Sequence, residues 1–492
     1  MLKFNKYLVL IFFCFLFLFR LHNALAYNPY WGYDGGGHID YLFSLVQHHQ
    51  FPDIAHNYVA WHEPLYYLIF ASFLKIFLFF GVDLDSKIIL QFLSLGQAIL
   101  SIGTSFLIYK LFKLLGQNNN FSNEIIFFSI VLVSFLPSFN QASTFFTNEL
   151  LSYFFILLAL YYFLKYFYYS PIYQTKHCVS LGIILGLGLL TKITILILIL
   201  CFLIYFFLDF IFRIKIKFFH YRLLSASRSD SMVNLSDPSA IAQGPDQKQE
   251  NIKKRFFKIS LVFILSGILY APWLFYKSNN LLGFVSVNNP NFLTPQSLKP
   301  DKRLLFFCGF DFDIFRFPYY YSGARKFASM LYADFFWDYY VTIENQDFIV
   351  HARENNLENI IATNHNNHNF ASFQNYYLNR ALSFLSLFIF AVFVLGFWDY
   401  LVRIRKDRKL FFKILIPASF LAASIYQAYR YPYYDHGVVK AIFIFPAFLY
   451  LVPAGLARIK KIHKKLYILF LFFLSFYVLC LVLLYWIQKF NY

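Results

Sequence analysis

Two clusters of ionisable residues near the start of this chain have the residue types of a catalytic site. The first, Tyr33-Asp34-Gly35-Gly36-Gly37-His38, places a carboxylate and an imidazole at the ends of a glycine run, just after the first apolar segment. The second, His62-Glu63-Pro64-Leu65-Tyr66-Tyr67, opens another apolar segment. Such groups can take a proton from a reacting hydroxyl. Their position beside apolar segments indicates chemistry at a membrane surface rather than simple anchoring.

Asp34 has two interpretations. Its carboxylate could cap the amphipathic helix expected from about His38 to His49. A cap does not explain the three glycines, which cost conformational entropy unless something must approach the backbone closely. The alternative is a general base held at the membrane face. A divalent metal is a further hypothesis. Its candidate ligands are Asp34, His38, His62 and Glu63, which come from loops without a fixed ligand spacing.

Three charged residues further along the chain also have a structural and a functional interpretation. Glu149 begins an apolar run, where it could face a polar cavity or simply favour a helix start. Lys192 interrupts a Leu- and Ile-rich run, and it either snorkels to the interface or neutralises an anion such as a phosphate. Arg430, among the tyrosines of the segment 429–437, could also meet a phosphate. The Asn- and His-rich tract 364–369 is interpreted as a solvated loop rather than a metal site.

Composition fixes the class of protein that carries these residues. The chain has 492 residues, of which 59% are hydrophobic and 14% charged. Soluble domains do not have this composition, and apolar runs of about 20 residues can each cross a bilayer. The net charge of +18 comes from Lys and Arg clusters between the apolar runs, which encode topology and argue against nucleic-acid binding. The five cysteines follow neither a metal-ligand nor a disulfide spacing.

The apolar runs predict an all-α polytopic membrane protein with about eleven transmembrane helices. The expected spans are roughly 7–26, 87–109, 124–139, 145–162, two short helices within 178–212 that meet at Lys192, 256–275, 381–402, 411–428, 438–456 and 466–487. Residues 65–80 are short for a span and are expected to lie on the outer surface. With the N-terminus inside and the first segment kept as a signal anchor, every dense basic cluster falls inside and Asp34 falls outside.

The same trace divides the chain into five parts. They are a transmembrane module at 1–212 with its first exterior loop at 27–86, a basic and partly disordered cytoplasmic loop at 213–255, a transmembrane helix at 256–275, a small exterior loop domain at 276–380, and the C-terminal transmembrane helices at 381–492.

Four motifs, in this order, resemble the membrane glycosyltransferases of the GT-C superfamily. The resemblance is to the branch that holds protein mannosyltransferases and aminoarabinose transferases, like those of glycosyltransferase family 39. The motifs are Tyr33-Asp34-Gly35-Gly36-Gly37-His38, His62-Glu63-Pro64-Leu65-Tyr66-Tyr67, Thr147-Asn148-Glu149 and Gly186-Leu187-Gly188-Leu189-Leu190-Thr191-Lys192. The likeness covers about residues 1–212, and beyond that only the architecture agrees. Where the family often has a second acid and a proline, this chain has Gly35 and Glu63, which leaves its metal dependence open.

The resemblance implies a glycosyltransferase of the cell envelope that uses a sugar linked to a polyprenyl phosphate. An exterior carboxylate takes the proton of an acceptor hydroxyl, and a single inverting attack at the anomeric carbon releases the lipid phosphate. The absence of a nucleotide-binding motif fits such a donor. The catalytic candidates are Asp34, Glu63 and Glu149. The substrate-binding candidates are His38, His62 and Lys192, and Arg430 joins them from its own tyrosine-rich segment, outside the resemblance.

The expected partners are the lipid-linked donor, the bilayer, and a glycan, lipid or protein acceptor, with no nucleic acid. The expected location is a bacterial inner membrane, with the active site on its exterior face. A transporter or flippase of lipid-linked saccharides is the alternative function. That class often shows internal repeats and ionisable residues at mid-membrane. Here the ionisable clusters lie in exterior loops and no repeat is visible, which favours the enzyme.

Overall fold

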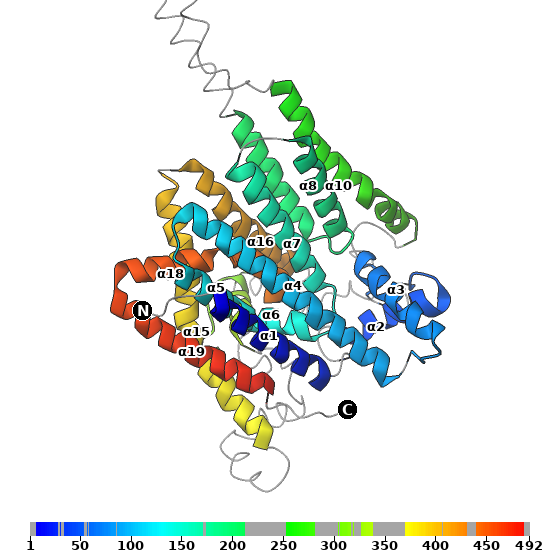
Figure 1. Cartoon of the computed structure of the whole chain (residues 1–492), viewed down its shortest axis with the longest axis horizontal. Helices are drawn as coiled ribbons and strands as arrows, with labels where there is room; N and C mark the ends of the chain where they lie inside the picture. Colours follow the sequence, from blue (N-terminus) through cyan, green and yellow to red (C-terminus); the bar gives the residue numbers. More distant parts are fainter. Residues whose placement is uncertain are drawn as a thin grey trace, which may run out of the picture.

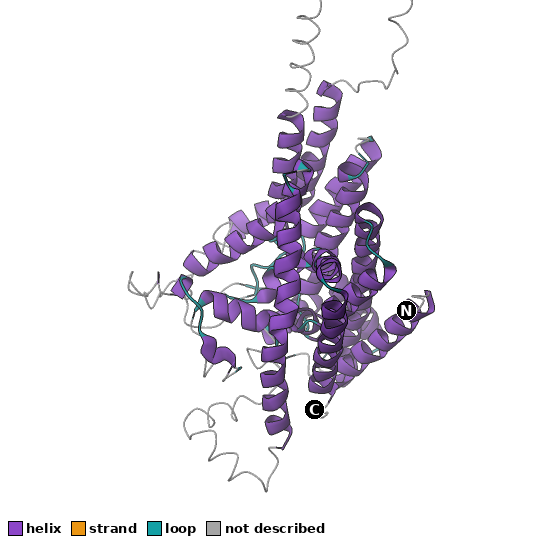
Figure 2. Cartoon of the chain, turned by 90° about the vertical axis from the view of Figure 1, so that its left-hand side faces the viewer, coloured by secondary structure: helices purple, strands orange, loops and turns teal. Residues whose placement is uncertain are grey.

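The computed structural model describes residues 6–27, 30, 34–53, 57, 59–84, 86–170, 174–211, 252–280, 304, 306–315, 318, 326–337, 370–405, 407–430 and 439–486. Every regular element within these ranges is a helix, and loops join the helices (Figure 2). The predicted all-α class is therefore confirmed. The segments 213–251 and 341–369, with the expected cytoplasmic loop and the Asn- and His-rich tract, lie outside the described residues.

Seven helices of the described ranges are long and apolar enough to cross a bilayer. They are α1 (Lys6–Ala26), α4 (Lys87–Asn119), α7 (Glu149–Phe163, continued to Tyr168 by η2), α10 (Ile252–Asn280), α15 (Phe370–Arg403), α16 (Phe411–Arg430) and α19 (Lys464–Trp486). An eighth span results if α5 (Asn123–Phe135) and α6 (Pro137–Thr144), which are bent by 57°, count as one. This number is below the eleven or so that the sequence predicts.

Two differences account for the lower number. The region 178–212 does divide at Lys192, as predicted, but α8 (Thr175–Leu189) and the helix Ile195–Ile211 are both shorter than a typical span. The expected span 438–456 is wrong as a single helix. It forms three short helices, η6 (Ala441–Phe443), α17 (Phe445–Phe448) and α18 (Leu451–Ile462). Pro446 and Pro453 each lack a backbone N–H and suit the first turn of a helix, so the chain restarts there.

The segment between α1 and α4 carries three short helices. They are α2 (Gly35–Phe43), the wider-turn segment η1 (Ser44–His48) and α3 (Leu65–Phe79). Figure 1 shows α2 and α3 together at the edge of the long helices, beside α4. The structure starts α2 at Gly35 and not at His38, so the glycine run forms the first turn of the helix. α3 has 15 residues, which agrees with its interpretation as too short to cross the membrane.

Small residues allow the closest helix crossings. A Cβ added at Gly182 of α8 would lie 2.8 Å from the carbonyl oxygen of Val262 in α10, and one at Gly186 would lie 2.6 Å from Leu269. Lipid gives helices little hydrophobic reason to associate, so close backbone approach supplies the packing energy. The two glycines thus hold α8 against α10, and the turn after α8 carries Lys192.

An arginine from α1 completes the bend between α5 and α6. Pro137 has no N–H, so carbonyl groups at the end of α5 lose their helical partners. Arg20 donates from Nη2 to the carbonyl oxygen of Ser134 at 2.6 Å, and Asn140 donates from Nδ2 to that of Phe135 at 2.9 Å. Arg20 also donates to Oδ1 of Asn140. The bend directs α6, whose residues are all buried, toward the start of α7.

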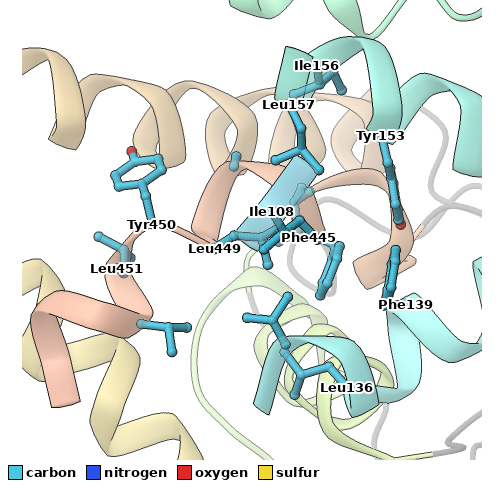
Figure 3. Packing of buried hydrophobic residues seen from close by; sticks show 14 of the residues in the cluster. Ile108, Leu136, Phe139, Tyr153, Ile156, Leu157, Phe445, Leu449, Tyr450 and Leu451 are labelled. Atoms are coloured by element: carbon cyan, nitrogen blue, oxygen red, sulfur yellow. The ribbon is translucent and has the colours of Figure 1, made fainter. Parts of the chain in front are cut away.

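Aromatic packing joins α6 and α7 to the segment after residue 440. Figure 3 shows Phe139, Tyr153 and Phe445 facing one another. The rings of Phe139 and Phe445 stack at 5.5 Å with an interplanar angle of 12°. The hydroxyl of Tyr153 donates to the carbonyl oxygen of Ile442. These contacts fix η6 over the first turns of α7. They also fix Lys440, which directly precedes η6.

Four cations gather where α4, α15 and α18 end and α16 begins, and we call this region the basic end. Their partners are Asn119 for Arg403 (3.4 Å), Tyr169 for Lys413 (3.0 Å), Asp399 for Arg458 (3.9 Å) and Glu124 for Lys460. Basic residues from three separate parts of the sequence thus meet at one end of the bundle, as the topology requires. That this end faces the cytoplasm stays a prediction.

Candidate active site

Asp34 stands at the start of α2 without using its side chain as a cap. Its backbone lies in the left-handed region, with φ 60° and ψ 19°, which residues other than glycine rarely adopt. Its carbonyl oxygen accepts the N–H of His38 at 3.0 Å and so closes the first turn. The carboxylate is exposed and makes no capping hydrogen bond within the described residues. Among the described residues, therefore, the backbone of Asp34 helps to close the first turn of α2, whereas its carboxylate does not cap the helix.

Open space lies beside the glycine run. A Cβ added at Gly36 would have no described atom within 4 Å, so packing does not require glycine there. Asn57 holds the run from its other side, because Nδ2 of Asn57 donates to the carbonyl oxygen of Gly37 at 2.9 Å. The space beside Gly36 leaves room for a ligand to approach the backbone close to Asp34.

A chain of hydrogen bonds runs inward from α2 to the start of α7. Nδ1 of His38 lies 2.6 Å from the hydroxyl of Tyr67, and that hydroxyl lies 3.3 Å from Nδ1 of His62. Nδ1 of His62 is also 3.3 Å from Nδ2 of Asn148. Burial lowers the pKa of His38 to about 3 and the pKa of His62 well below its usual value. Both imidazoles are therefore neutral at neutral pH.

The partners of Asn148 fix the tautomer of His62. Nδ2 of Asn148 also faces the carbonyl oxygen of Thr191 at 3.3 Å, and a carbonyl can only accept. The atom that faces both groups must therefore be the amide nitrogen, which resolves the usual ambiguity of an amide side chain. Nδ1 of His62 then accepts, and its proton lies on Nε2. Oδ1 of Asn148 is buried and has no hydrogen-bond partner among the described residues.

Glu63 is brought to the same region but is held by α10. Its Oε1 lies 3.0 Å from Nζ of Lys277 and accepts from the hydroxyl of Tyr270 at 3.4 Å. Both members of the ion pair are buried. The ammonium of Lys277 also lies 5.8 Å from the ring of Trp61 and 5.7 Å from that of Trp273. The geometry gives Glu63 a role in fastening the segment before α3 to α10, and its predicted role as a base is not tested.

Lys192 and Glu149 form a second buried ion pair. Glu149 is the first residue of α7, as predicted, and Lys192 lies in the turn after α8. Nζ of Lys192 donates to Oε1 of Glu149 and lies 4.7 Å from the ring centre of Phe443. The turn is fixed to α3, because the N–H of Leu65 donates to the carbonyl oxygen of Leu190 at 2.9 Å. Four motifs distant in sequence thus converge on one region, which we call the loop end.

Lys440 belongs to the loop end and was not predicted as a site residue. It is buried directly before η6, within electrostatic range of Asp34 and Lys192. Burial lowers the pKa of Lys440, while the charges of Asp34 and Asp334 raise it. The sequence did carry a signal, because the prediction placed this lysine inside the span 438–456. A lysine within a span marks a functional site by default.

The four proposed metal ligands do not form one site. Among the described residues, no group of three or more His, Cys, Asp or Glu side chains is placed to hold a metal ion. Glu63 is engaged by Lys277, and His62 directs Nδ1 to Asn148. The donor set therefore does not fit a single ion, and a requirement for a divalent metal stays an untested prediction.

Arg430 is the last residue of α16, and its side chain lies outside what the structure describes. The tyrosine-rich segment that follows, 431–438, is also outside the described residues, as is most of the expected exterior domain at 276–380. The proposed contact between Arg430 and a phosphate is therefore untested.

Comparison with known proteins gives one family and one set of similar structures. Residues 62–226 match the family described as dolichyl-phosphate-mannose-protein mannosyltransferase. A comparison with curated protein sequences found no match. A crystal structure of the Archaeoglobus fulgidus oligosaccharyltransferase in the apo form has 14% identity and a TM-score of 0.45, over 99% of this chain and 56% of that chain. A structure of that enzyme tethered with an acceptor peptide containing the NVT sequon has 12% identity and a TM-score of 0.46, over 99% and 55%.

This chain spans little more than half the length of those oligosaccharyltransferase chains. The family match, in contrast, covers a third of this chain and contains four of its site candidates, namely His62, Glu63, Glu149 and Lys192. Over residues 62–226 the chain is similar to this mannosyltransferase family, and that match, together with helices long and apolar enough to cross a membrane, supports a membrane glycosyltransferase of the GT-C type.

Proposed function

We propose that this protein transfers a sugar from a polyprenyl-phosphate-linked donor to an acceptor hydroxyl at the exterior face of the membrane, with inversion at the anomeric carbon. The observation that carries the proposal is the carboxylate of Asp34, which is exposed, uncapped and within electrostatic range of Lys192 and Lys440. A base and two cations in one place are the groups that this reaction requires.

The proposed step assigns one task to each group. Asp34 accepts the proton of the acceptor hydroxyl, and the hydroxyl oxygen attacks the anomeric carbon from the side opposite the phosphate. The bond between that carbon and the phosphate oxygen breaks, and the negative charge moves to the lipid phosphate. Lys192 stabilises the leaving phosphate, because a charge-assisted contact is stronger in a buried site than in water. Lys440 adds a second positive charge nearby.

Two polar atoms near the base are suited to hold the sugar. Oδ1 of Asn148 is a buried acceptor with no partner among the described residues, and a sugar hydroxyl could donate to it. Nε2 of His62 carries a proton and could donate to a sugar oxygen. A site that leaves buried polar atoms unpaired loses stability unless a ligand pairs them. These atoms therefore support a hydroxyl-rich ligand rather than an apolar one.

The proposal includes a lipid, glycan or protein as the acceptor and a bacterial inner membrane as the location. The test is sugar transfer in proteoliposomes that contain a polyprenyl-phosphate-linked sugar and a candidate acceptor. Asp34→Asn keeps the size of the side chain and should lower the transfer rate by about 10²–10⁴ while the protein stays folded. The matched control is Asp40→Asn, which changes an exposed carboxylate on the same helix and should leave the rate unchanged.

Two results would contradict the proposal. Transfer by Asp34→Asn at the wild-type rate would remove Asp34 as the base and make Glu149 the next candidate. Movement of the lipid-linked sugar across the liposome membrane by the wild-type protein, with no transfer to any acceptor, would favour the flippase alternative.

A further inference from the structure

The cation proposed to bind the donor phosphate has an anionic partner within the protein itself. Nζ of Lys192 donates to Oε1 of Glu149, both side chains are buried, and the ammonium of Lys192 lies against the ring of Phe443. The pair joins the turn after α8 to the first residue of α7. A donor phosphate cannot form a full ion pair with Lys192 while Lys192 is paired with Glu149.

The surroundings make it costly for both anions to share this lysine. The pair is nearly removed from water, and charges interact strongly where the local dielectric is low. Glu63 and Asp34 are further anionic groups within electrostatic range of Lys192. Lys440 is the other cation in range, and it already interacts with Asp34 and Asp334. A phosphate added beside an intact pair would therefore place like charges together without enough positive charge.

We propose that Glu149 occupies the phosphate position of Lys192 until the donor arrives, and that donor binding exchanges one anion for the other. This inference rests on the proposed function, because it takes Lys192 as the ligand of the donor phosphate. The exchange explains how a buried lysine stays paired in the absence of the donor. An unpaired buried charge would be strongly destabilising.

The exchange also frees a carboxylate at the place where the donor is bound. Glu149 follows Asn148 directly, and the amide of Asn148 holds both His62 and the carbonyl oxygen of Thr191. Once released from Lys192, the carboxylate of Glu149 can accept a hydrogen bond from the donor sugar. The carboxylate becomes available only after the phosphate has bound, so donor binding itself completes the site.

The exchange predicts that removing the charge of Glu149 increases the affinity of the protein for a lipid phosphate. The probe is a polyprenyl monophosphate, and its affinity for the detergent-solubilised full-length protein is measured by microscale thermophoresis. Glu149→Gln removes the internal competitor and should tighten binding by about tenfold, which corresponds to one charge-assisted hydrogen bond. Lys192→Met should weaken binding by a similar factor. In the double variant the gain should vanish, because Glu149 acts only through Lys192.

The matched control is the corresponding polyprenol, which lacks the phosphate and should bind all variants equally. Unchanged affinity in Lys192→Met would overturn the proposed role of Lys192 and the exchange with it. Weaker binding in Lys192→Met together with no gain in Glu149→Gln would overturn the exchange alone and leave the proposed function in place. If Glu149→Gln does not fold, Glu149→Asp replaces it, since the shorter carboxylate reaches Lys192 less well. Binding of that variant no tighter than wild type would also overturn the exchange.

Discussion

The two ends of the helical bundle both bury lysines, but they provide different partners for them. At the basic end, Nζ of Lys413 donates to the hydroxyl of Tyr169 at 3.0 Å and lies 4.9 Å from the ring centre of Tyr400. At the loop end, Lys192 pairs with Glu149, within electrostatic range of Asp34. The direct contacts of Lys413 are neutral groups, although Asp407 and Asp399 lie within electrostatic range. Lys192, in contrast, contacts a carboxylate directly, and a phosphate could replace that carboxylate.

This difference separates a cation that holds helices together from a cation that can change partner. Lys413 is held by a hydroxyl and by aromatic rings, whereas an incoming anion could compete for the ion pair of Lys192. The loop end also keeps an unused carboxylate at Asp34 and an unpaired acceptor at Asn148 among its described residues. We therefore expect substitutions at the basic end to alter stability, and substitutions among the exchangeable groups of the loop end to alter activity.

The largest effect on stability should come from the buried ion pair between Lys277 and Glu63, which holds the segment before α3 against α10. Lys277→Met leaves the carboxylate of Glu63 buried and unpaired, which should cost about 3–5 kcal/mol of folding free energy. The double variant Lys277→Met, Glu63→Gln removes both charges and should recover most of that loss. Thermal unfolding of the detergent-purified variants measures both values. Equal stability of Lys277→Met and the wild type would mean that this pair is not a fastening.

Acid should affect the loop end through its neutral histidines. The pKa of His38 is lowered from 6.5 to about 3 in the folded protein, so between these pH values the unfolded chain binds a proton that the folded protein excludes. Stability should therefore fall as the pH falls below about 6.5, by about 1.4 kcal/mol per pH unit for this residue. His38→Gln should remove this contribution. Unfolding midpoints between pH 7.5 and pH 4 should then converge for the two proteins, and parallel curves would contradict burial of a neutral imidazole.

Lys413→Met tests the basic end directly. The substitution keeps the apolar stem and removes the ammonium, so Tyr169 loses its donor, at a cost of about 1–3 kcal/mol. The unfolding midpoint should fall, while the transfer rate per folded molecule should stay at the wild-type value. A variant that keeps its stability but loses transfer activity would reverse the comparison between the two ends.

The smallest effect is expected at Gly36. The position is helical and open, so Gly36→Ala should leave stability unchanged or raise it by about 0.5–1 kcal/mol. Transfer activity should nevertheless decrease, because the new methyl group fills the space through which a ligand reaches the backbone beside Asp34. Steady-state kinetics with the lipid-linked donor would detect the change. Full activity in Gly36→Ala would mean that the glycine run serves neither packing nor ligand approach.

Local breaks in the apolar pattern were predictable from the sequence. The division at Lys192 and the helix start at Glu149 are confirmed, because polar residues interrupt long apolar runs at both places. Both features depend on neighbouring residues alone. The bend at Pro137 belongs to the same class, although the prediction treated residues 124–139 as one straight helix.

Pairings between distant segments were not predictable. Nothing near Glu63 in the sequence indicates that Lys277 binds it, and nothing near Lys192 selects Glu149 over Asp34 as its partner. These choices depend on how α7, α8 and α10 pack, which a single sequence does not reveal. Lys440 was missed for a related reason. The apolar character of residues 438–456 outweighed Pro446 and Pro453, and so a segment that folds back into the bundle was interpreted as a span.

The fastening of the α5–α6 bend by Arg20 has a consequence for membrane insertion during synthesis. α1 leaves the ribosome long before Ser134 and Asn140, so Arg20 enters the bilayer without its acceptors. A lone arginine in a bilayer helix is costly and tends to stay near the lipid headgroups. We therefore expect α1 to reach its final depth only after the bent pair of α5 and α6 has been inserted beside it. A different signal anchor of equal hydropathy, placed instead of α1, would insert readily. It would lack Arg20, and so the bend between α5 and α6 would lose its hydrogen-bond donor.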